Sequence, residues 1–391
     1  MAADVLPTRR IVIMMPNLSG YLQNVQIGIS EYFLQRPNWI WTSVIPRPEY
    51  ANTLAMAQLH PDGVIAYVEE VYLGELQNLG VPVVDVSNWL AKMHFPSVLA
   101  DDEEVGRLAA RYFMDLGLRH FAVTGIRDAK FSDLRIKGYT EALAAQGLGA
   151  TLIGWDDSSL PRDIVVPPGI NPGLFHWLKA LPKPLGVFAT NDFTAAPMLD
   201  ICRHAGIRVP EDVCVLGVDN DELFTKVTHP PLSSIDLPTR KIGFEAARLL
   251  DALMAGGAAP AEPVLLPPIR VETRQSTNLL AIPDQDVQTA VRYIRERVHT
   301  QVSVEDLLKV VSVNRRYLER KFRQYLGRSP LQEIRRVRLD KAKEMLSASD
   351  LSVAAIARRS GFPNAERLAN VFHASVGITP TAYRRNFRLE D

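Results

Sequence analysis

Short polar side chains follow five of the apolar runs within positions 1–275 of this 391-residue chain. Amides and carboxylates can form two hydrogen bonds at once with neighbouring hydroxyls, and flat aromatic rings can cover the C–H faces of a cyclic polyol. The set therefore suits a sugar, although each residue taken singly could instead cap the helix that follows it. The five segments are Asn17 to Tyr21, Ser87 to Trp89, Gly125 to Arg127, Asn191 to Asp192, and Asp219 to Asn220.

A second set of chemistry-bearing side chains, mainly arginines, lies in the C-terminal segment 284–391. This segment contains 21 Lys and Arg against 13 Asp and Glu, although the whole chain has no net charge. A basic segment on an acidic body indicates a polyanion partner at one end of the molecule. Charge alone leaves nucleic-acid binding and a solvated helical surface equally open.

The sequence carries no motif that indicates an enzyme, a metal site or a secreted protein. Nucleotide-binding glycine motifs, the G-x-S-x-G and H-E-x-x-H motifs, and ligand-like spacing of the eight histidines are all absent. Cys202 and Cys214 lie in apolar surroundings and are predicted to be buried packing residues. No apolar run is long enough for a secretion signal or a membrane span. We therefore expect a cytoplasmic protein that is not an enzyme, needs no cofactor or metal, and has no membrane partner.

The body of the chain, positions 1–275, alternates short apolar runs with amphipathic segments. Continuous apolar strands separated by helices indicate parallel sheets that are covered on both faces, and the number of runs is enough for two doubly wound α/β lobes. In such folds ligands bind beyond the carboxyl ends of the strands, where the polar segments lie. The apolar runs include residues 9–15, 63–68, 81–87, 120–125, 185–190 and 213–219, and helices are expected at 21–35, 72–79 and 102–116.

Residues 186–235 resemble the effector domain of the LacI family, which is related to periplasmic sugar-binding proteins. The matching motifs are A-x-N-D from Ala189, G-I-x-V-P-x-D-V from Gly206, G-x-D-N from Gly217, and P-x-S-S-I ending at Ile235. The resemblance implies a periplasmic-binding-protein-like domain that binds a sugar between two lobes. It assigns hydroxyl contacts to Asn191 and Asp219 and a cleft position to Arg135, while Asn88 stands where the family often has an acidic residue. The further expected contacts are Tyr21, Gln23 and Trp89.

The C-terminal segment 284–391 contains two copies of one helix-turn-helix unit. In the second copy Gly361 supplies the positive φ of a sharp turn, Phe362 packs in the corner, and Asn364 caps the second helix. In the first copy Ser312 to Asn314 take the place of the glycine. Residues 330–349 are predicted to form a connecting helix; if it separates the two second helices by about 34 Å, they enter successive major grooves. The pairs that align are Leu318 with Leu368, Phe322 with Phe372, Gly327 with Gly377, and Pro330 with Pro380.

This tail resembles the AraC family. The matching signature begins at Ala357 and reads A-x-x-x-G-F, followed by a leucine, a phenylalanine, G-x-T-P and Y-R. Arginine can contact guanine, asparagine adenine, and glutamate cytosine, whereas other arginines hold phosphates. The resemblance implies phosphate contacts from Arg358, Arg359, Arg384 and Arg385. It implies base contacts from Arg315, Arg316, Glu319 and Arg320 in the first unit and from Asn364, Glu366, Arg367 and Asn370 in the second.

Together these patterns predict a two-lobed effector domain at 1–275, a linker at 276–285 and a DNA-binding domain at 286–391, with helix-turn-helix units at about 303–326 and 352–376. The combination is similar to that of the xylose-operon activators of bacteria. It implies a regulator that responds to xylose or another monosaccharide, acts as a homodimer, and has double-stranded DNA and RNA polymerase as partners. Three alternatives are a repressor, an α/β enzyme fused to a DNA-binding tail, and an architectural DNA-binding protein without a ligand.

Overall fold

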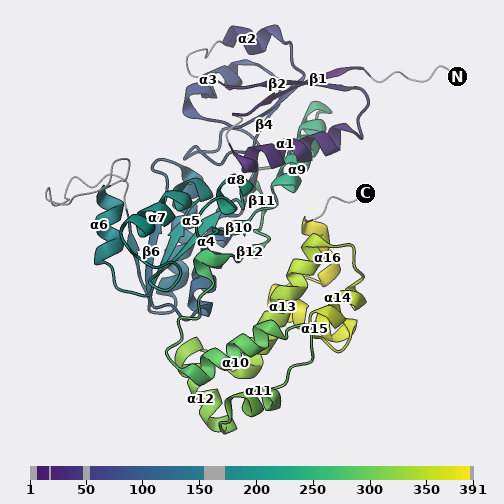
Figure 1. Ribbon diagram of the computed structural model, residues 1–391. Helices are drawn as coiled ribbons and strands as arrows, with labels where there is room; N and C mark the ends of the chain where they lie inside the picture. The colour runs from purple at the N-terminus through teal and green to yellow at the C-terminus, as the bar shows by residue number, and fades with distance from the viewer. Residues whose placement is uncertain (1–6, 17–18, 47–52, 154–171, 388–391) are drawn as a thin grey trace.

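The computed structural model describes residues 7–16, 19–46, 53–153 and 172–387, and it consists of two α/β lobes and an all-helical tail (Figure 1). The predicted fold class, a doubly wound two-lobed domain followed by an all-helical domain, is confirmed. Within the described ranges, no helix is both long and apolar enough to cross a membrane.

The first lobe is built on a four-stranded parallel sheet in the order β2-β1-β3-β4. Its inner strands are continuous apolar runs, and every residue of β3 is buried because helices cover both faces. The strands are β1 (Arg9–Met14), β2 (Trp39–Val44), β3 (Gly63–Ala66) and β4 (Val83–Asp85), and the helices are α1 (Gly20–Phe33), α2 (Thr53–Gln58), α3 (Glu70–Asn78) and α9 (Thr239–Met254).

The second lobe is built on a six-stranded sheet in the order β12-β10-β9-β8-β6-β7, in which β12 is antiparallel. Cys202 and Cys214 are free and fully buried here, as predicted. The strands are β6 (His120–Thr124), β7 (Ala150–Leu152), β8 (Leu185–Ala189), β9 (Val213–Val218), β10 (Ser233–Asp236) and β12 (Arg270–Glu272). The helices are α4 (Asp102–Asp115), α5 (Lys130–Ala144), α6 (Pro172–Ala180), α7 (Asp192–His204), α8 (Glu222–Thr225) and the short η2 (Gln275–Thr277).

The chain passes between the lobes three times: after β4, between β10 and α9, and between α9 and β12. Two of these passages contain β5 (Val98–Ala100) and β11 (Val264–Leu266), which pair in parallel as a separate two-stranded ladder. Helix α9 packs against α1 of the first lobe although it follows β10 of the second. The connection between the lobes is therefore narrow compared with the sheets on either side.

The tail has two hydrophobic cores, one under each helix-turn-helix unit. Gly361 adopts φ +79°, as the sequence predicted, and in the first unit Ser312, within the predicted turn, adopts the left-handed conformation with φ +55°. The side chains of Asn314 and Asn364 cap the second helices of the two units, because each accepts a hydrogen bond from a backbone N–H group in the first turn of its helix. The helices are α10 (Gln285–Glu296), α11 (Val304–Val311), α12 (Arg315–Leu326), α13 (Pro330–Ala348), α14 (Val353–Arg359), α15 (Ala365–Val376) and α16 (Pro380–Phe387).

The segment predicted as a linker, 276–285, is packed rather than free. Ser276 is fully buried, and its hydroxyl donates to the carbonyl of Val215 in β9 at 2.7 Å. Ile282 is 1% exposed and belongs to the first core of the tail. Side chains of this linker therefore fill the joint between body and tail.

Candidate functional site

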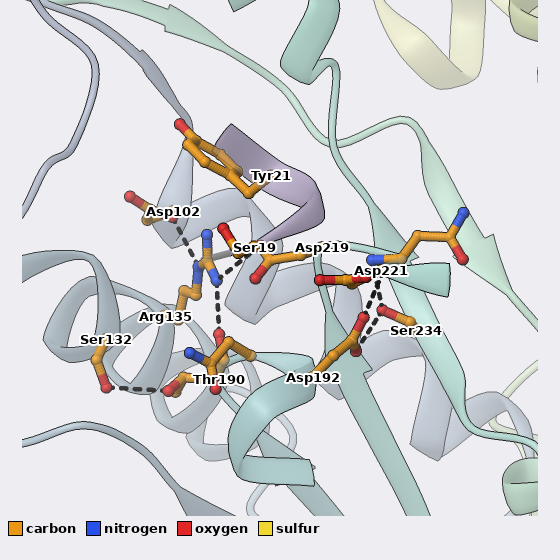
Figure 2. A network of polar contacts seen from close by, with 12 residues as sticks. Ser19, Tyr21, Asp102, Ser132, Arg135, Thr190, Asp192, Asp219, Asp221 and Ser234 are labelled. Atoms are coloured by element: carbon orange, nitrogen blue, oxygen red, sulfur yellow. Dashed lines mark hydrogen bonds and ion pairs between the residues drawn. The ribbon is translucent and has the colours of Figure 1, made fainter. Parts of the chain in front are cut away.

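A cavity of about 450 Å³ lies between the two lobes, beyond the carboxyl ends of their strands. This is the position that the doubly wound fold predicts for a ligand. Figure 2 shows polar side chains gathered at this site, and aromatic rings also line the cavity. Its polar lining is Ser19, Glu69, Ser87, Asn88, Asp102, Arg135, Asn191, Asp192, Asp219 and Asp221, and its aromatic lining is Tyr21, Tyr67, Trp89, Phe131, Phe193 and Phe224.

Arg135 of α5 is the central cation of the cleft and is only 4% exposed. Its Nε donates to Asp102 Oδ1 at 2.7 Å, and its Nη1 donates to the carbonyl oxygen of Thr190 at 2.5 Å. The same Nη1 lies 3.7 Å from Asp219 Oδ1 (Figure 2). The guanidinium group is thus fixed in place by two hydrogen bonds and directed toward the carboxylate that the sequence predicted as a ligand contact.

Asp102, the first residue of α4, joins two of the predicted contacts. One carboxylate oxygen accepts from Arg135, and the other accepts from Asn88 Nδ2 at 2.6 Å. Burial raises the pKa of Asp102, and Arg135 and Asn88 act in the opposite direction. Asn88 follows β4 of the first lobe, whereas Arg135 belongs to the second, so a single carboxylate connects both sides of the cleft.

Asp219 follows β9 and has φ +102°, a conformation that few residues other than glycine adopt. Burial raises its pKa to about 7, although the positive charge of Arg135 opposes this rise. Because 3.7 Å is too long for a hydrogen bond, the carboxylate keeps acceptor capacity for a ligand.

Asp192 and Asn191 perform structural tasks at the edge of the same cavity. The Asp192 carboxylate accepts from the Asp221 backbone N–H at 2.8 Å and from the Ser234 hydroxyl at 2.7 Å. Asn191 caps α7, because its side-chain oxygen accepts from the backbone N–H of Thr194 at 2.9 Å. The cap occupies the amide oxygen of Asn191 and leaves its amide nitrogen as a donor at the cavity wall.

Aromatic rings line the cleft from both lobes. Trp89 lies against Tyr67 and Phe131, with ring centroids 6.1 and 5.7 Å apart. Across the cavity, Phe193 and Phe224 meet edge to face at 6.1 Å. Phe193 is 64% exposed, which leaves its face open to a molecule in the cleft. Such surfaces suit the apolar faces of a sugar ring.

The sequence predicted part of the cavity lining. Asp219, Arg135, Asn191, Asn88, Tyr21 and Trp89 all line the cavity. Gln23 does not, because α1 turns it outward and leaves it exposed. Asn17 lies outside the described residues. Asp102, Tyr67, Phe131 and Phe193 were not predicted. The adjacent acids Asp101 and Asp102 follow the apolar run that ends at Ala100, but the sequence does not show which of the two faces the cleft.

The two second helices of the tail, α12 and α15, have the features of DNA-recognition helices. Leu318 and Phe322 of α12 are buried, as are Leu368 and Phe372 of α15, so their opposite faces point away from the cores. Arg315 on this outer face is paired with Glu319 at 2.9 Å and Glu305 at 3.2 Å. The exposed residues of the predicted set are Arg315, Arg316, Arg320, Asn364, Glu366, Arg367 and Asn370, and Glu319 is half-buried.

The arginines predicted to hold phosphates differ in their surroundings. Arg358 and Arg359 are exposed at the end of α14, and Arg385 is exposed on α16. Arg384 is half-buried and donates to the carbonyl oxygen of Leu351, which ties α16 to the segment before α14. Its guanidinium group therefore has a structural partner inside the tail, which the basic sequence context did not indicate.

The two helix-turn-helix units are held at a fixed separation. Helix α13 has 19 residues and is therefore about 28 Å long. Arg338 of α13 donates to the carbonyl oxygen of Val302 at 2.9 Å in the first unit. Gly361, in the turn of the second unit, lies so close to the carbonyls of Val298 and Thr300 that a Cβ would meet them at 2.4 and 2.7 Å.

Models of known protein families match the chain in two places. A periplasmic binding protein-like domain matches residues 110–277, and a helix-turn-helix domain matches residues 307–386. Together with the cleft and the paired recognition helices, these two matches define a transcription regulator. It joins a periplasmic binding protein-like domain to a DNA-binding helix-turn-helix domain.

Proteins with the same domain order are similar to this chain along almost its whole length. It is 29% identical over 383 residues to the xylose operon regulatory protein of Haemophilus influenzae, which covers 94% of this chain and 95% of that one. It is 28% identical over 391 residues to the xylose operon regulatory protein of Escherichia coli K12, covering 96% of each. A solved structure of a xylose-binding transcription activator is 25% identical, with a TM-score of 0.60, and covers 97% of this chain and 98% of that one.

Proposed function

We propose that this chain is a transcription activator whose DNA binding responds to a pentose of the xylose type, bound between the two lobes. The observation that carries the proposal is the cluster that the buried Arg135, Asp102 and Asn88 form with the half-buried Asp219 at the cavity wall. Relatives with the same domain order, named as xylose operon regulatory proteins and as a xylose-binding transcription activator, support the choice of sugar and the direction of control.

The chemistry of the cleft supports a neutral polyhydroxylated ligand. The Asp219 carboxylate accepts a hydroxyl hydrogen, and Arg135 donates to a hydroxyl or ring oxygen beside it. Trp89 and Phe193 cover the C–H faces of the ring from opposite lobes. A sugar that contacts both lobes favours their closed arrangement, and a tenfold preference for that arrangement supplies about 1.4 kcal/mol.

On the DNA side, we propose that α12 and α15 enter neighbouring major-groove segments of double-stranded DNA. Their exposed arginines and amides carry base contacts, and Arg358 and Arg359 hold phosphates. A homodimer in the cytoplasm would place four such helices on one promoter, beside RNA polymerase. Affinity for DNA should fall steeply with salt, since each neutralised phosphate releases a counterion.

We propose ligand binding without turnover, because the relatives along the whole chain are regulators. Incubation with D-xylose followed by chromatography tests this point. Recovery of unchanged sugar is expected, and a product formed by the purified chain would favour the alternative of an enzyme fused to a DNA-binding tail.

The deciding experiment is calorimetry with D-xylose, L-arabinose, D-ribose and D-glucose on wild type and on Asp219→Asn. Asparagine tolerates the φ of +102° and keeps the shape of the side chain, so the change removes the charge with little strain. Loss of a charged hydrogen bond should weaken D-xylose binding by about 10- to 100-fold. Asp200→Asn is the matched control, because Asp200 is 65% exposed on α7 and its carboxylate pairs with its neighbour Arg203. Equal affinities of wild type and Asp219→Asn would contradict the proposed site.

A further inference from the structure

Helix α4 runs from the ligand cleft to the DNA-binding tail. Its first residue, Asp102, binds Arg135 and Asn88 in the cleft, and its last residue, Asp115, contacts the tail. With 14 residues it spans about 20 Å. One rigid element therefore has one end in each of the two proposed functional regions.

At the cleft end, α4 is locked to α5, the helix that carries Arg135. A Cβ on Gly106 would meet the backbone oxygen of Arg135 at 2.0 Å, and a Cβ on Gly138 would meet that of Glu103 at 2.0 Å. Backbones this close cannot slide past one another, because protein interiors are close-packed. A displacement of Arg135 toward a ligand therefore moves α4 and α5 together.

At the other end, Asp115 binds two arginines of the tail. Its Oδ1 lies 2.6 Å from Arg328 Nη1, and its Oδ2 lies 3.1 Å from Arg336 Nη1. Both arginines also bind Glu333 of α13, which is 0% exposed. Burial alone would raise the pKa of Glu333, but Arg336 and Arg328 hold it down to about 2. Asp115, the last residue of α4, thus adds a second carboxylate to the ion pairs that Glu333 forms with Arg328 and Arg336 at the start of α13.

The segment after α4 adds hydrogen bonds to the same part of the tail. The carbonyl of Leu116 accepts from the backbone N–H of Ala281 at 2.8 Å. Arg119 Nη2 donates to the carbonyl of Tyr325, in α12, at 2.8 Å. The segment that follows α4 therefore contacts the first recognition helix, α12, directly.

The second unit of the tail is anchored elsewhere on the body. Lys241 of α9 donates to the backbone carbonyl of Arg385, and the Tyr383 hydroxyl donates to the carbonyl of Ile269 at 3.2 Å. Helix α9 packs on α1 in the first lobe, whereas α4 belongs to the second. The tail is consequently attached to both lobes.

We propose that α4 transmits occupancy of the cleft to the tail, and that Asp115 is the positioning residue through which the second lobe sets the orientation of α13. The inference rests on the proposed function, since it concerns the regulation of that same site. Closure of the lobes changes the distance between the Asp115 anchor and the Lys241 anchor. The tail must then turn, because α13 joins its two units as one rigid rod.

The test compares wild type, Asp115→Asn, Asp115→Glu and the control Arg111→Gln. Asparagine keeps an acceptor for one arginine but removes the charge shared by two, and glutamate restores that charge. Arg111 is exposed on the same helix and pairs with Glu104 of α4, so its replacement changes charge without touching the tail. D-xylose affinity is measured by calorimetry. DNA affinity, with and without D-xylose, is measured by fluorescence anisotropy on a duplex that wild type has enriched from a random-sequence library.

For wild type and Arg111→Gln we expect D-xylose to change the DNA Kd by about tenfold. For Asp115→Asn we expect D-xylose affinity within about twofold of wild type, but a change of DNA Kd below about threefold, with recovery in Asp115→Glu. Hydrogen exchange in α13 should respond to D-xylose in wild type and not in Asp115→Asn, which is a readout that mere loss of stability would not produce.

The outcomes separate the two levels of the proposal. If Asp115→Asn binds D-xylose and keeps the full wild-type change in DNA affinity and in α13 exchange, the role of Asp115 is refuted while the proposed function stands. If wild type itself binds none of the four sugars, the proposed function fails and this inference falls with it.

Discussion

The turn glycine of the second helix-turn-helix unit offers a stringent test of how the two recognition helices are held. Gly361→Ala places a side chain at φ +79° and brings its Cβ to 2.4 Å from the carbonyl oxygen of Val298 and 2.7 Å from that of Thr300. The left-handed conformation alone costs about 1–2 kcal/mol for a residue with a Cβ. Overlap with two backbone carbonyls adds about 1–3 kcal/mol, since neither can move without the first unit. The total is about 2–5 kcal/mol.

Gly377 and Gly327 provide matched controls within the same tail. They have φ +82° and +69°, but a Cβ on either would meet nothing within 4 Å. Their alanine variants should therefore cost only the conformational part, about 1–2 kcal/mol. Native-state hydrogen exchange in the full chain reports these costs as local opening free energies, from the α15 amides for Gly361→Ala and Gly377→Ala and from the α12 amides for Gly327→Ala. DNA affinity should fall more for Gly361→Ala than for Gly377→Ala, because the overlap displaces α15 relative to α12. If Gly361→Ala and Gly377→Ala agree within about 0.5 kcal/mol, the contact between the units does not exist in solution.

The remaining predictions concern the cleft and the DNA surface. The ionised Asp219 carboxylate is the form that accepts a hydroxyl hydrogen, and its pKa is raised to about 7, so affinity for D-xylose should increase with pH. From pH 6 to pH 8 the Kd should fall about tenfold by calorimetry, and Asp219→Asn should show a flat profile. Arg316→Ala should cost about 1–3 kcal/mol and relax the preference at one base position, as binding to a panel of single-base variants would reveal. Arg358→Ala should leave base preference unchanged and lower the salt slope of DNA binding by about one, as titrations at several salt concentrations would show.

Features set by neighbouring residues could be predicted from the sequence in detail. The left-handed Gly361 and the cap at Asn364 both occur as predicted, because turns and caps depend on residues a few positions apart. The apolar runs became strands for a similar reason, since their burial on both faces excludes polar residues.

Features set by distant residues could not be predicted. Asp101 and Asp102 are adjacent acids, yet Asp101 caps α4 by accepting from the Glu104 backbone N–H at 3.0 Å, while Asp102 faces the cleft. Nothing local distinguishes them. In the same way Arg384 lies in a basic run that suggested a phosphate contact, but folding brings the carbonyl of Leu351 within its reach. The sequence around Asp115 likewise does not indicate that its carboxylate binds Arg328 and Arg336, because both partners lie more than 200 residues further along the chain.

Helix α13 also constrains how a protein of this design can evolve new targets. Inserting one residue into it would turn the second unit by about 100° and carry it about 1.5 Å further along, so the two units would face different sides of the duplex. The close fit of Gly361 against the first unit resists such a change as well. Under the proposed function, the spacing of the bases that one chain contacts is therefore inherited as a unit, whereas individual base preferences can change by substitution on the outer faces of α12 and α15.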